Sequence, residues 1–177
     1  GFTMDSAVEL QISGSVKLDA FGFVLASGDF DLYKGQMTVA DGVRTLTDAS
    51  LLTVELSQVN LFVGVGGAFN ADDTINTDDA IGFNAGPLDL TMAIVQDPVT
   101  PANSYTALEL TLADASLVGI DGLIFEVSGQ AMVNQGPVGG RLDWSTATNA
   151  TNDPDDLLPG FTMDSAVELQ ISGSVKL

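Results

Sequence analysis

The stretch GFTMDSAVELQISGSVKL occupies residues 1–18 and recurs without a single change at residues 160–177. From Val8 to Leu18, aliphatic or small residues stand at even positions and polar residues at odd positions. A period of two predicts a half-buried β-strand, because an α-helix would scatter the same aliphatic residues around its circumference. We therefore expect each copy to form a strand, or a strand pair broken near Gly14.

A strand with one apolar face needs partners, and an identical segment at both ends suggests where they come from. We predict that this segment pairs with a neighbouring copy of the chain, either an adjacent repeat or a separate subunit, by strand addition. The aliphatic residues of this predicted assembly strand are Val8, Leu10, Ile12, Val16 and Leu18 in the first copy and Val167, Leu169, Ile171, Val175 and Leu177 in the second.

The same alternation returns along the rest of the chain. It appears in the runs 52–56, 59–65, 88–94, 108–112 and 123–127. No segment shows the 3.6-residue period of an amphipathic helix. The pair Asp41-Gly42, between MTVA and VRTL, predicts a tight hairpin, and Gly139-Gly140 predicts a similar turn before residues 141–144. The sequence therefore predicts an all-β fold.

The two copies define a repeat with a period of 159 residues, the distance from Gly1 to Gly160. We expect residues 1–159 to be one repeat period, residues 160–177 to be the start of the next, and the chain to be one segment of a tandem array. A fainter aliphatic-Glu-Leu motif divides the period into three units, near 4–47, 48–100 and 101–147, followed by a loop or linker at 148–159. The middle unit carries an insertion, roughly residues 68–79.

Two all-β architectures fit this organisation. In a β-solenoid, each unit would form one wide coil that stacks on the next. In an immunoglobulin-like β-sandwich, each period would be a discrete two-sheet domain. The internal units favour the solenoid, whereas the hairpin signals and the polar segment TNATNDPDDLLPG (residues 148–160) favour discrete antiparallel modules. Of the two we favour an elongated, solenoid-like repeat unit, with the β-sandwich as the alternative.

The composition excludes several classes of function. The chain has 24 acidic and 5 basic residues, a net charge of -19, which argues against binding to nucleic acid or to anionic membranes. It has no Cys and no His, so disulfides, zinc sites and histidine-based catalysis are absent. No apolar run is long enough for membrane insertion. The acidic surface suits cations such as calcium, or serves only solubility.

Two clusters of aspartates are candidate calcium ligands, and calcium is the one cofactor that the sequence suggests. Calcium takes six to eight oxygen ligands from carboxylates, amides and carbonyls. The alternative for both clusters is a hydrated acidic loop. The candidates are Asp72, Asp73, Asp78 and Asp79 in the insertion and Asp153, Asp155 and Asp156 before the second copy.

The chain is not expected to be an enzyme. Its acidic residues lie mostly at the outward positions of predicted strands or in loops, where carboxylates are simply hydrated. Identical repeats also add reach and avidity more than turnover. Trp144 is the one aromatic residue placed to stack on a sugar, and burial in the core is the alternative for it.

Three stretches carry a resemblance to a known class of proteins. They are LFVGVGGAF…DDAIGF, SYTALELTLADASLVGIDGLIFEVSG and GSVKLDAFGFVLASGDFDL. Over most of Val8 to Gln135, the chain resembles the tandem repeats of giant secreted or surface bacterial proteins of the hemolysin-type, adhesin-like kind. The resemblance implies a location outside the cell or at its surface and a structural or adhesive role, and it brings no catalytic residues with it.

These observations favour a structural repeat of a giant extracellular bacterial protein. Repeat stacking or strand pairing between neighbouring copies would build a filament, a stalk or the shaft of an adhesin. The alternative is a calcium-dependent or carbohydrate-binding adhesion module, whose partner would be a cell-surface glycan.

Overall fold

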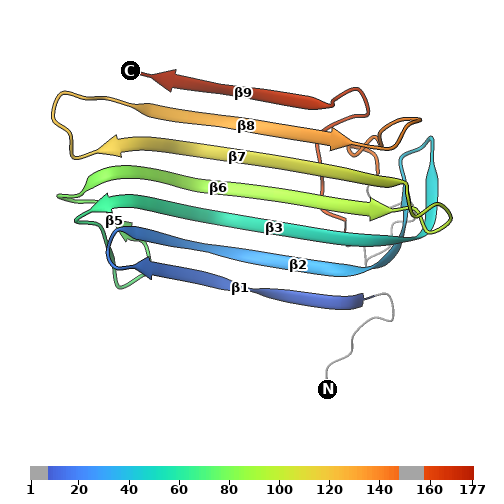
Figure 1. The fold of residues 1–177 in the computed structure, drawn as a ribbon, viewed down its shortest axis with the longest axis horizontal. Helices are drawn as coiled ribbons and strands as arrows, with labels where there is room; N and C mark the ends of the chain where they lie inside the picture. Colours follow the sequence, from blue (N-terminus) through green and yellow to red (C-terminus); the bar gives the residue numbers. More distant parts are fainter. Residues whose placement is uncertain (1–7, 148–157) are drawn as a thin grey trace.

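The computed structural model describes residues 8–147 and 158–177. These residues form one open antiparallel sheet of seven strands in the order β1-β2-β3-β6-β7-β8-β9, with a separate two-stranded hairpin, β4-β5 (Figure 1). The strands are β1 (Val8–Ala20), β2 (Val24–Ala40), β3 (Thr45–Val65), β4 (Ala68–Phe69), β5 (Ile75–Asn76), β6 (Ile81–Gln96), β7 (Ser104–Val118), β8 (Glu126–Gln135) and β9 (Leu169–Lys176). The all-β prediction is confirmed, and the large sheet does not close on itself.

The turn between β2 and β3 forms where the Asp41-Gly42 pair predicted it. Ala40 pairs with Thr45 across the turn, and Gly42 adopts a φ of +81°, which glycine reaches without steric strain. The Oδ1 atom of Asp41 accepts hydrogen bonds from the backbone N–H groups of Val43 (2.9 Å) and Arg44 (2.6 Å). The aspartate therefore holds the turn closed through its own side chain.

The sheet has one apolar face and one polar face, because successive side chains of a strand point to opposite sides. We name each face by the cross-strand rows that the register places on it. A central row of the apolar face runs through Phe30, Leu56, Leu90, Leu110, Ala131 and Ile171. The neighbouring row of the polar face runs through Ser13, Asp31, Glu55, Thr91 and Glu109.

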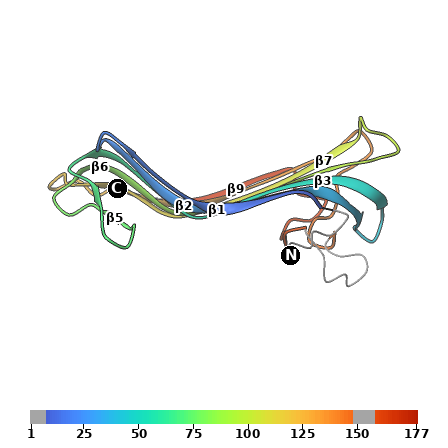
Figure 2. The same ribbon diagram turned by 90° about the horizontal axis from the view of Figure 1, so that it is seen from below.

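A line of irregularities crosses the middle of the sheet and keeps the apolar residues on one face. In β3 the runs 52–56 and 59–65 belong to a single strand, joined by a bulge at Gln58, whose φ is +52°. Strands β6 and β7 both advance three residues between successive pairs, since the pair Leu88–Leu112 is followed by the pair Ala85–Ala115. Each of these steps inverts the alternation and bends the strand, and the sheet is visibly bent near its middle (Figure 2).

The polar face is covered at both ends and open in the middle. At one end the predicted insertion folds back as the β4-β5 hairpin and packs over Leu25 and Phe62. At the other end residues 141–147, which we call the covering segment, pack with residues 158–163 over Tyr33 and Val95. Figure 2 shows both additions on the same side of the sheet. The opposite, apolar face has no covering layer among the described residues.

The Gly139-Gly140 pair forms a turn but does not begin a hairpin in the sheet. Gly140 N–H donates to the carbonyl oxygen of Pro137 at 3.1 Å. Residues 141–144 do not form a strand. They cross over the polar face of the sheet, where the side chains of Leu142 and Trp144 are fully buried. The chain therefore leaves the sheet at this turn.

Asp41 also ties the covering segment to the β2–β3 turn, which makes its contribution to stability dependent on pH. Its Oδ2 atom accepts a hydrogen bond from Asp143 N–H at 3.2 Å, and its side chain is only 2% exposed. Burial raises the pKa of Asp41, but the N–H groups of Arg44, Val43 and Asp143 together with the Arg44 charge lower it by more. The net result is a pKa below the ordinary value of 3.8.

We expect Asp41→Asn to cost about 1–3 kcal/mol at neutral pH, because it removes a charged acceptor of several hydrogen bonds. A lowered folded pKa contributes stability above the unfolded pKa, near pH 4, and this contribution disappears as pH falls through the folded value. Urea unfolding of both proteins at pH 7 and pH 3 measures the effect. The gap between them should narrow at pH 3, and a gap of constant size would contradict the assignment.

Candidate assembly site at the two edges of the sheet

The two copies of the repeated segment form the two edges of the sheet. β1 comes from the first copy and pairs with β2, and β9 comes from the second copy and pairs with β8. One period contributes six strands to the sheet, and every neighbouring pair is antiparallel. An even number of antiparallel steps leaves β9 running in the same direction as β1 (Figure 1). β9 therefore has the same direction at one edge of the sheet as β1 has at the other.

The register at the two edges gives the repeated strand a partner on each side. β8 meets β9 in eight consecutive pairs, from Glu126 with Lys176 to Val133 with Leu169. The same sequence in β1 meets β2 from Leu10 to Lys17. Figure 1 shows β2 and β8 on opposite sides of this strand. Each copy thus leaves open the edge that the other copy uses.

The aliphatic residues of the predicted assembly strand lie on these edges and remain half exposed. In β1, Ile12 is 46% and Val16 53% exposed, and in β9, Ile171 is 74% and Val175 63% exposed. Val8 and Val167 instead pack against the larger core cluster, and Leu177 follows the end of β9. The edge strands of this chain are long and aliphatic, which is the kind of edge that pairs with another strand.

The first residues of the second copy complete the core of the preceding unit. Phe161 and Met163 are buried, and the Phe161 ring packs edge-on against Trp144 with centroids 5.3 Å apart. On the polar face, Glu109 Oε1 accepts hydrogen bonds from Thr162 N–H (2.7 Å), Thr162 Oγ1 (2.9 Å) and Met163 N–H (3.2 Å). The repeated segment is thus a core element as well as an edge strand. We call this junction, residues 160–177 with β8, Glu109 and the covering segment, the seam.

Asn134 of β8 lies at the centre of the seam and is fully buried. Its Nδ2 atom donates to the carbonyl oxygens of Leu142 (2.9 Å) and Asp164 (3.0 Å), and its Oδ1 accepts from Trp144 Nε1 at 3.0 Å. One side chain therefore joins the sheet, the covering segment and the second copy. Because both Nδ2 hydrogens and the Oδ1 atom of this buried amide are hydrogen-bonded, the side chain fixes the positions of the sheet, the covering segment and the second copy.

We expect Asn134→Leu to destabilise the chain by about 3 kcal/mol, because it leaves two carbonyls and an indole N–H buried without partners. Urea unfolding measures the loss. Gln130→Leu is the matched control, since Gln130 lies on the same strand with an exposed side chain, and it should change stability by no more than about 0.5 kcal/mol. Equal effects of the two substitutions would contradict the role given to Asn134.

The lysine of the repeated segment makes a different ion pair at each edge. In β1, Lys17 pairs with Asp73 at the tip of the β4-β5 hairpin, and its Nζ lies 4.5 Å from the centroid of the Phe69 ring. In β9, the equivalent Lys176 pairs with Glu126 Oε2 at 3.0 Å. If one copy of this strand had neighbours on both sides, its lysine would lie near both carboxylates, the equivalents of Asp73 and Glu126.

No protein-family model, curated protein or solved structure matches the chain. Over residues 8–147 and 158–177, no helix is long and apolar enough to cross a membrane. The geometry of the two edges is therefore what supports a function.

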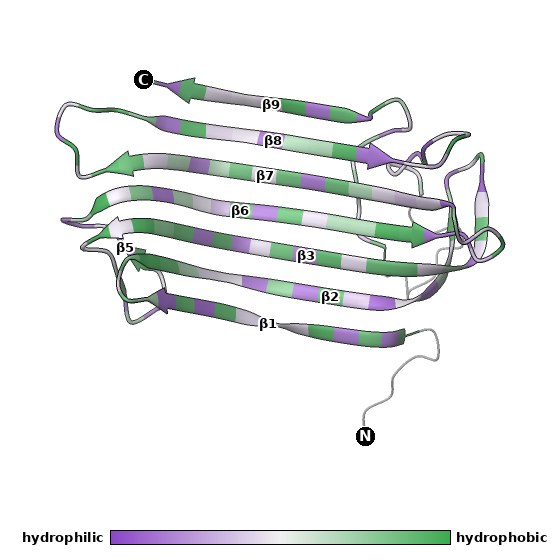
Figure 3. Cartoon of the chain, viewed as in Figure 1, coloured by the Kyte–Doolittle hydropathy of each residue, from purple (hydrophilic) through white to green (hydrophobic). Residues whose placement is uncertain are grey.

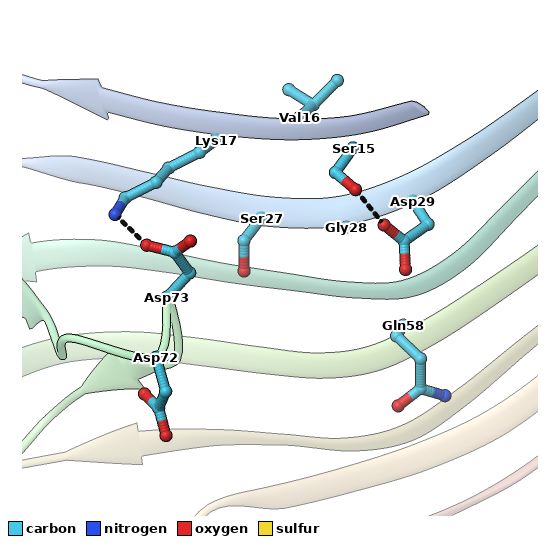
Figure 4. Close-up of a pocket in the computed structure, with 9 residues that line it drawn as sticks. All are labelled: Ser15, Val16, Lys17, Ser27, Gly28, Asp29, Gln58, Asp72 and Asp73. Atoms are coloured by element: carbon cyan, nitrogen blue, oxygen red, sulfur yellow. Dashed lines mark hydrogen bonds and ion pairs between the residues drawn. The ribbon is translucent and has the colours of Figure 1, made fainter. Parts of the chain in front are cut away.

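A polar depression of about 310 Å³ lies on the open middle of the polar face, beside the hairpin tip (Figure 4). Ser15 Oγ donates to Asp29 Oδ1 at 2.6 Å on one side of it, and Lys17 and Asp73 pair on the other. Because its charged groups already have partners within the chain, the depression has the character of a hydrated surface hollow.

The aspartates of the insertion are spread around the hairpin. Asp72 Oδ1 accepts hydrogen bonds from Thr74 Oγ1 (2.6 Å) and Thr74 N–H (3.2 Å), which lower the pKa of Asp72. Asp73 pairs with Lys17, Asp78 N–H donates to Asn76 Oδ1 at 2.7 Å, and Asp79 adopts a φ of +61°.

Within the described residues, no three acidic side chains gather into a group that could hold a metal ion. Asp153, Asp155 and Asp156 lie outside the described residues. The calcium hypothesis stays a prediction, and comparing the melting temperature in chelator and in millimolar calcium tests it.

Sequence reasoning missed the polar residues that hold the seam. Trp144, considered for sugar stacking, is fully buried against Phe161 and so presents no surface to a glycan. Glu109 and Asn134 stand at polar-face positions of regular strands. The alternating pattern of polar and apolar residues does not distinguish them there from hydrated surface residues. The one signal was indirect, since the repeated segment begins with the apolar Phe161 and Met163 outside its alternating part.

Proposed function

We propose that the chain is a structural repeat of a giant extracellular bacterial protein, in which successive periods form one continuous β-sheet. The observation that supports it is the position of the repeated strand, which stands at both edges of the sheet, runs in the same direction at each, and is paired on opposite sides. A following β2 would pair with β9, and a preceding β8 would pair with β1. The product is an elongated filament, stalk or adhesin shaft. The extracellular setting comes from the resemblance described above.

The register defines the repeat of this shaft. Six strands at about 4.8 Å spacing give about 29 Å per period along the sheet. Leu169 stands in the row of Ile12, although its counterpart in the first copy is Leu10, and Val175 likewise stands in the row of Leu18 rather than Val16. Successive periods would therefore be displaced by two residues, about 7 Å along the strands.

This arrangement differs in kind from both architectures that the sequence suggested. We propose a slanted ribbon that lengthens by adding strands to one sheet, in place of stacked coils or separate sandwich domains. The seam supports continuity, because the core of one period includes Phe161 and Met163 of the next copy. Units that share core residues cannot rotate freely against one another.

The proposal is tested with chains of one, two and three periods, each ending in residues 160–177. Small-angle X-ray scattering and electron microscopy should show a length that grows by about 29 Å per added period. Antibodies against the chain should label the outside of intact source cells. Periods that tumble independently as beads, or labelling confined to the cell interior, would each contradict the proposal.

A further inference from the structure

The apolar face of the sheet has no covering layer among the described residues, and strand pairing at the edges does not cover it. Its rows cross all seven strands, from Leu10, Ile12, Val16 and Leu18 in β1 to Leu169, Ile171 and Val175 in β9. Both covering elements pack on the other face (Figure 2). In Figure 3, green apolar segments recur along every strand, and the register gathers them on this one side.

The size of this face exceeds that of an ordinary exposed patch. Seven strands at about 4.8 Å spacing and about ten residues at 3.4 Å each give an area of about 1,100 Å². The largest apolar patch on a typical soluble monomer is about 300–600 Å². A stable protein–protein interface buries about 800 Å² on each partner. One face of the sheet is thus large enough to form a complete interface.

The distribution of charge favours a second copy of the apolar face as the partner of this face. The paired residues on the rows of the apolar face are uncharged except Lys34, which lies in the row of Leu10 towards one end of the face and is neutralised by Glu9, with Lys34 Nζ 2.5 Å from Glu9 Oε2. The central carboxylates, including Asp31, Glu55 and Asp89, stand on the polar face. Two sheets packed at about 10 Å would keep these carboxylates outward. Their separation then exceeds the Debye length of about 8 Å, so the net charge of each copy does not oppose contact.

The shape of the apolar face also favours packing against another sheet. Gly129 and Gly173 face each other across β8 and β9 and leave a shallow apolar depression of about 340 Å³, bordered by Leu110, Leu112 and Ile171. Large and small residues therefore alternate on this surface, which is the relief through which packed sheets interdigitate. A flat lipid surface offers no such counterpart, and a charge of -19 opposes anionic lipid.

We propose that two copies of the chain pack face to face through their apolar faces, forming a two-layer sandwich with both polar faces in water. This interface is independent of strand pairing at the edges, since it uses a face of the sheet and requires only the chain of residues 1–177. In the shaft proposed above, every period would present this face on the same side, and two shafts would pair into a ribbon of double thickness.

The test compares the full chain with Leu90→Lys and with the matched control Thr91→Lys. Leu90 lies in the central row of the apolar face, and Thr91, the next residue, lies on the open polar face. In a two-fold interface each substitution counts twice. Sedimentation equilibrium over a dilution series should show a dimer for the full chain and for Thr91→Lys. The dimer dissociation constant of Leu90→Lys should rise at least about 100-fold, since its lysines would be buried unpaired.

Thermal melting of the monomeric fraction shows whether Leu90→Lys still folds, and the milder Leu56→Gln provides a second variant if it does not. A monomeric full chain at high concentration would overturn the proposal. So would a dimer that both substitutions leave unchanged, which would point to edge pairing and leave the proposed shaft standing. Flotation of a monomeric chain with phosphatidylcholine vesicles, abolished by Leu90→Lys, would overturn it in favour of lipid.

Discussion

A chain that ends at residue 159 is expected to lose most of its stability as a monomer and to assemble head to tail. The deletion removes Phe161 and Met163 from the core and uncovers the edge of β8. Losing a buried Phe and a buried Met costs at least about 5 kcal/mol together, and a domain of this size has only about 5–15 kcal/mol in all. Residues 1–18 of a second molecule carry the same sequence as the deleted segment. They can therefore fill the vacant seam.

The measurement is made on the 1–159 and 1–177 chains in the Leu90→Lys background, so that pairing of apolar faces does not contribute. The longer chain should remain a monomer, because its own second copy fills the seam. The shorter chain should form a concentration-dependent ladder of oligomers. A synthetic peptide of the 18-residue segment should dissolve the ladder and restore the melting temperature.

Two peptides serve as controls for this rescue. The same segment with Phe161→Ala should rescue poorly, because the Phe161 ring packs against Trp144. A scrambled peptide should not rescue at all. A 1–159 chain that melts at the temperature of the full chain and stays monomeric would show that the second copy adds nothing to the fold, and it would remove the main support for a continuous sheet.

The strands of this fold were predictable because their signal is local. Alternation within ten or so residues identifies a strand wherever it lies, and the Asp41-Gly42 pair identifies its turn. The runs 52–56 and 59–65 even record the bulge at Gln58, as a change from even to odd positions. Without a structure, that change also fits two short strands with a turn between them. The continuity of β3 depends on β2 and β6, which hold both halves in one sheet.

The seam was not predictable, because it depends on contacts between distant residues. Asn134 is bound to Asp164 thirty residues away, and Glu109 to Thr162 at a distance of 53 residues. Nothing in the neighbourhood of either residue distinguishes it from a hydrated polar side chain. The choice between solenoid and sandwich had the same difficulty, since one local pattern of strands is compatible with several strand orders. The repeated segment predicted that a junction between copies exists. The residues that contact it at that junction could be identified only from the structure.

Trp144→Ala is expected to destabilise the full chain by about 3–5 kcal/mol, as truncation of a buried Trp does. Its indole is fully buried, donates to Asn134 Oδ1 and packs edge-on against Phe161. The loss should reach β9 as well, because Phe161 and Met163 anchor the segment that leads into that strand. Hydrogen exchange should therefore rise at the amides of β8 that face β9, together with a lower urea midpoint.

Two further variants separate this role from a general effect of losing an aromatic ring. Trp144→Phe keeps a ring beside Phe161 but loses the bond to Asn134, so it should cost less than the alanine variant and should protect β8 better. Phe21→Ala removes a ring that is 96% exposed in the β1–β2 turn, and it should leave stability within about 0.5 kcal/mol. If Trp144→Ala lowered the urea midpoint while exchange at β8 stayed unchanged, the indole would stabilise the covering segment alone. The seam would then depend on strand pairing, on Glu109 and on the hydrogen bond from Asn134 to Asp164, and joining one period to the next would not require the aromatic contact.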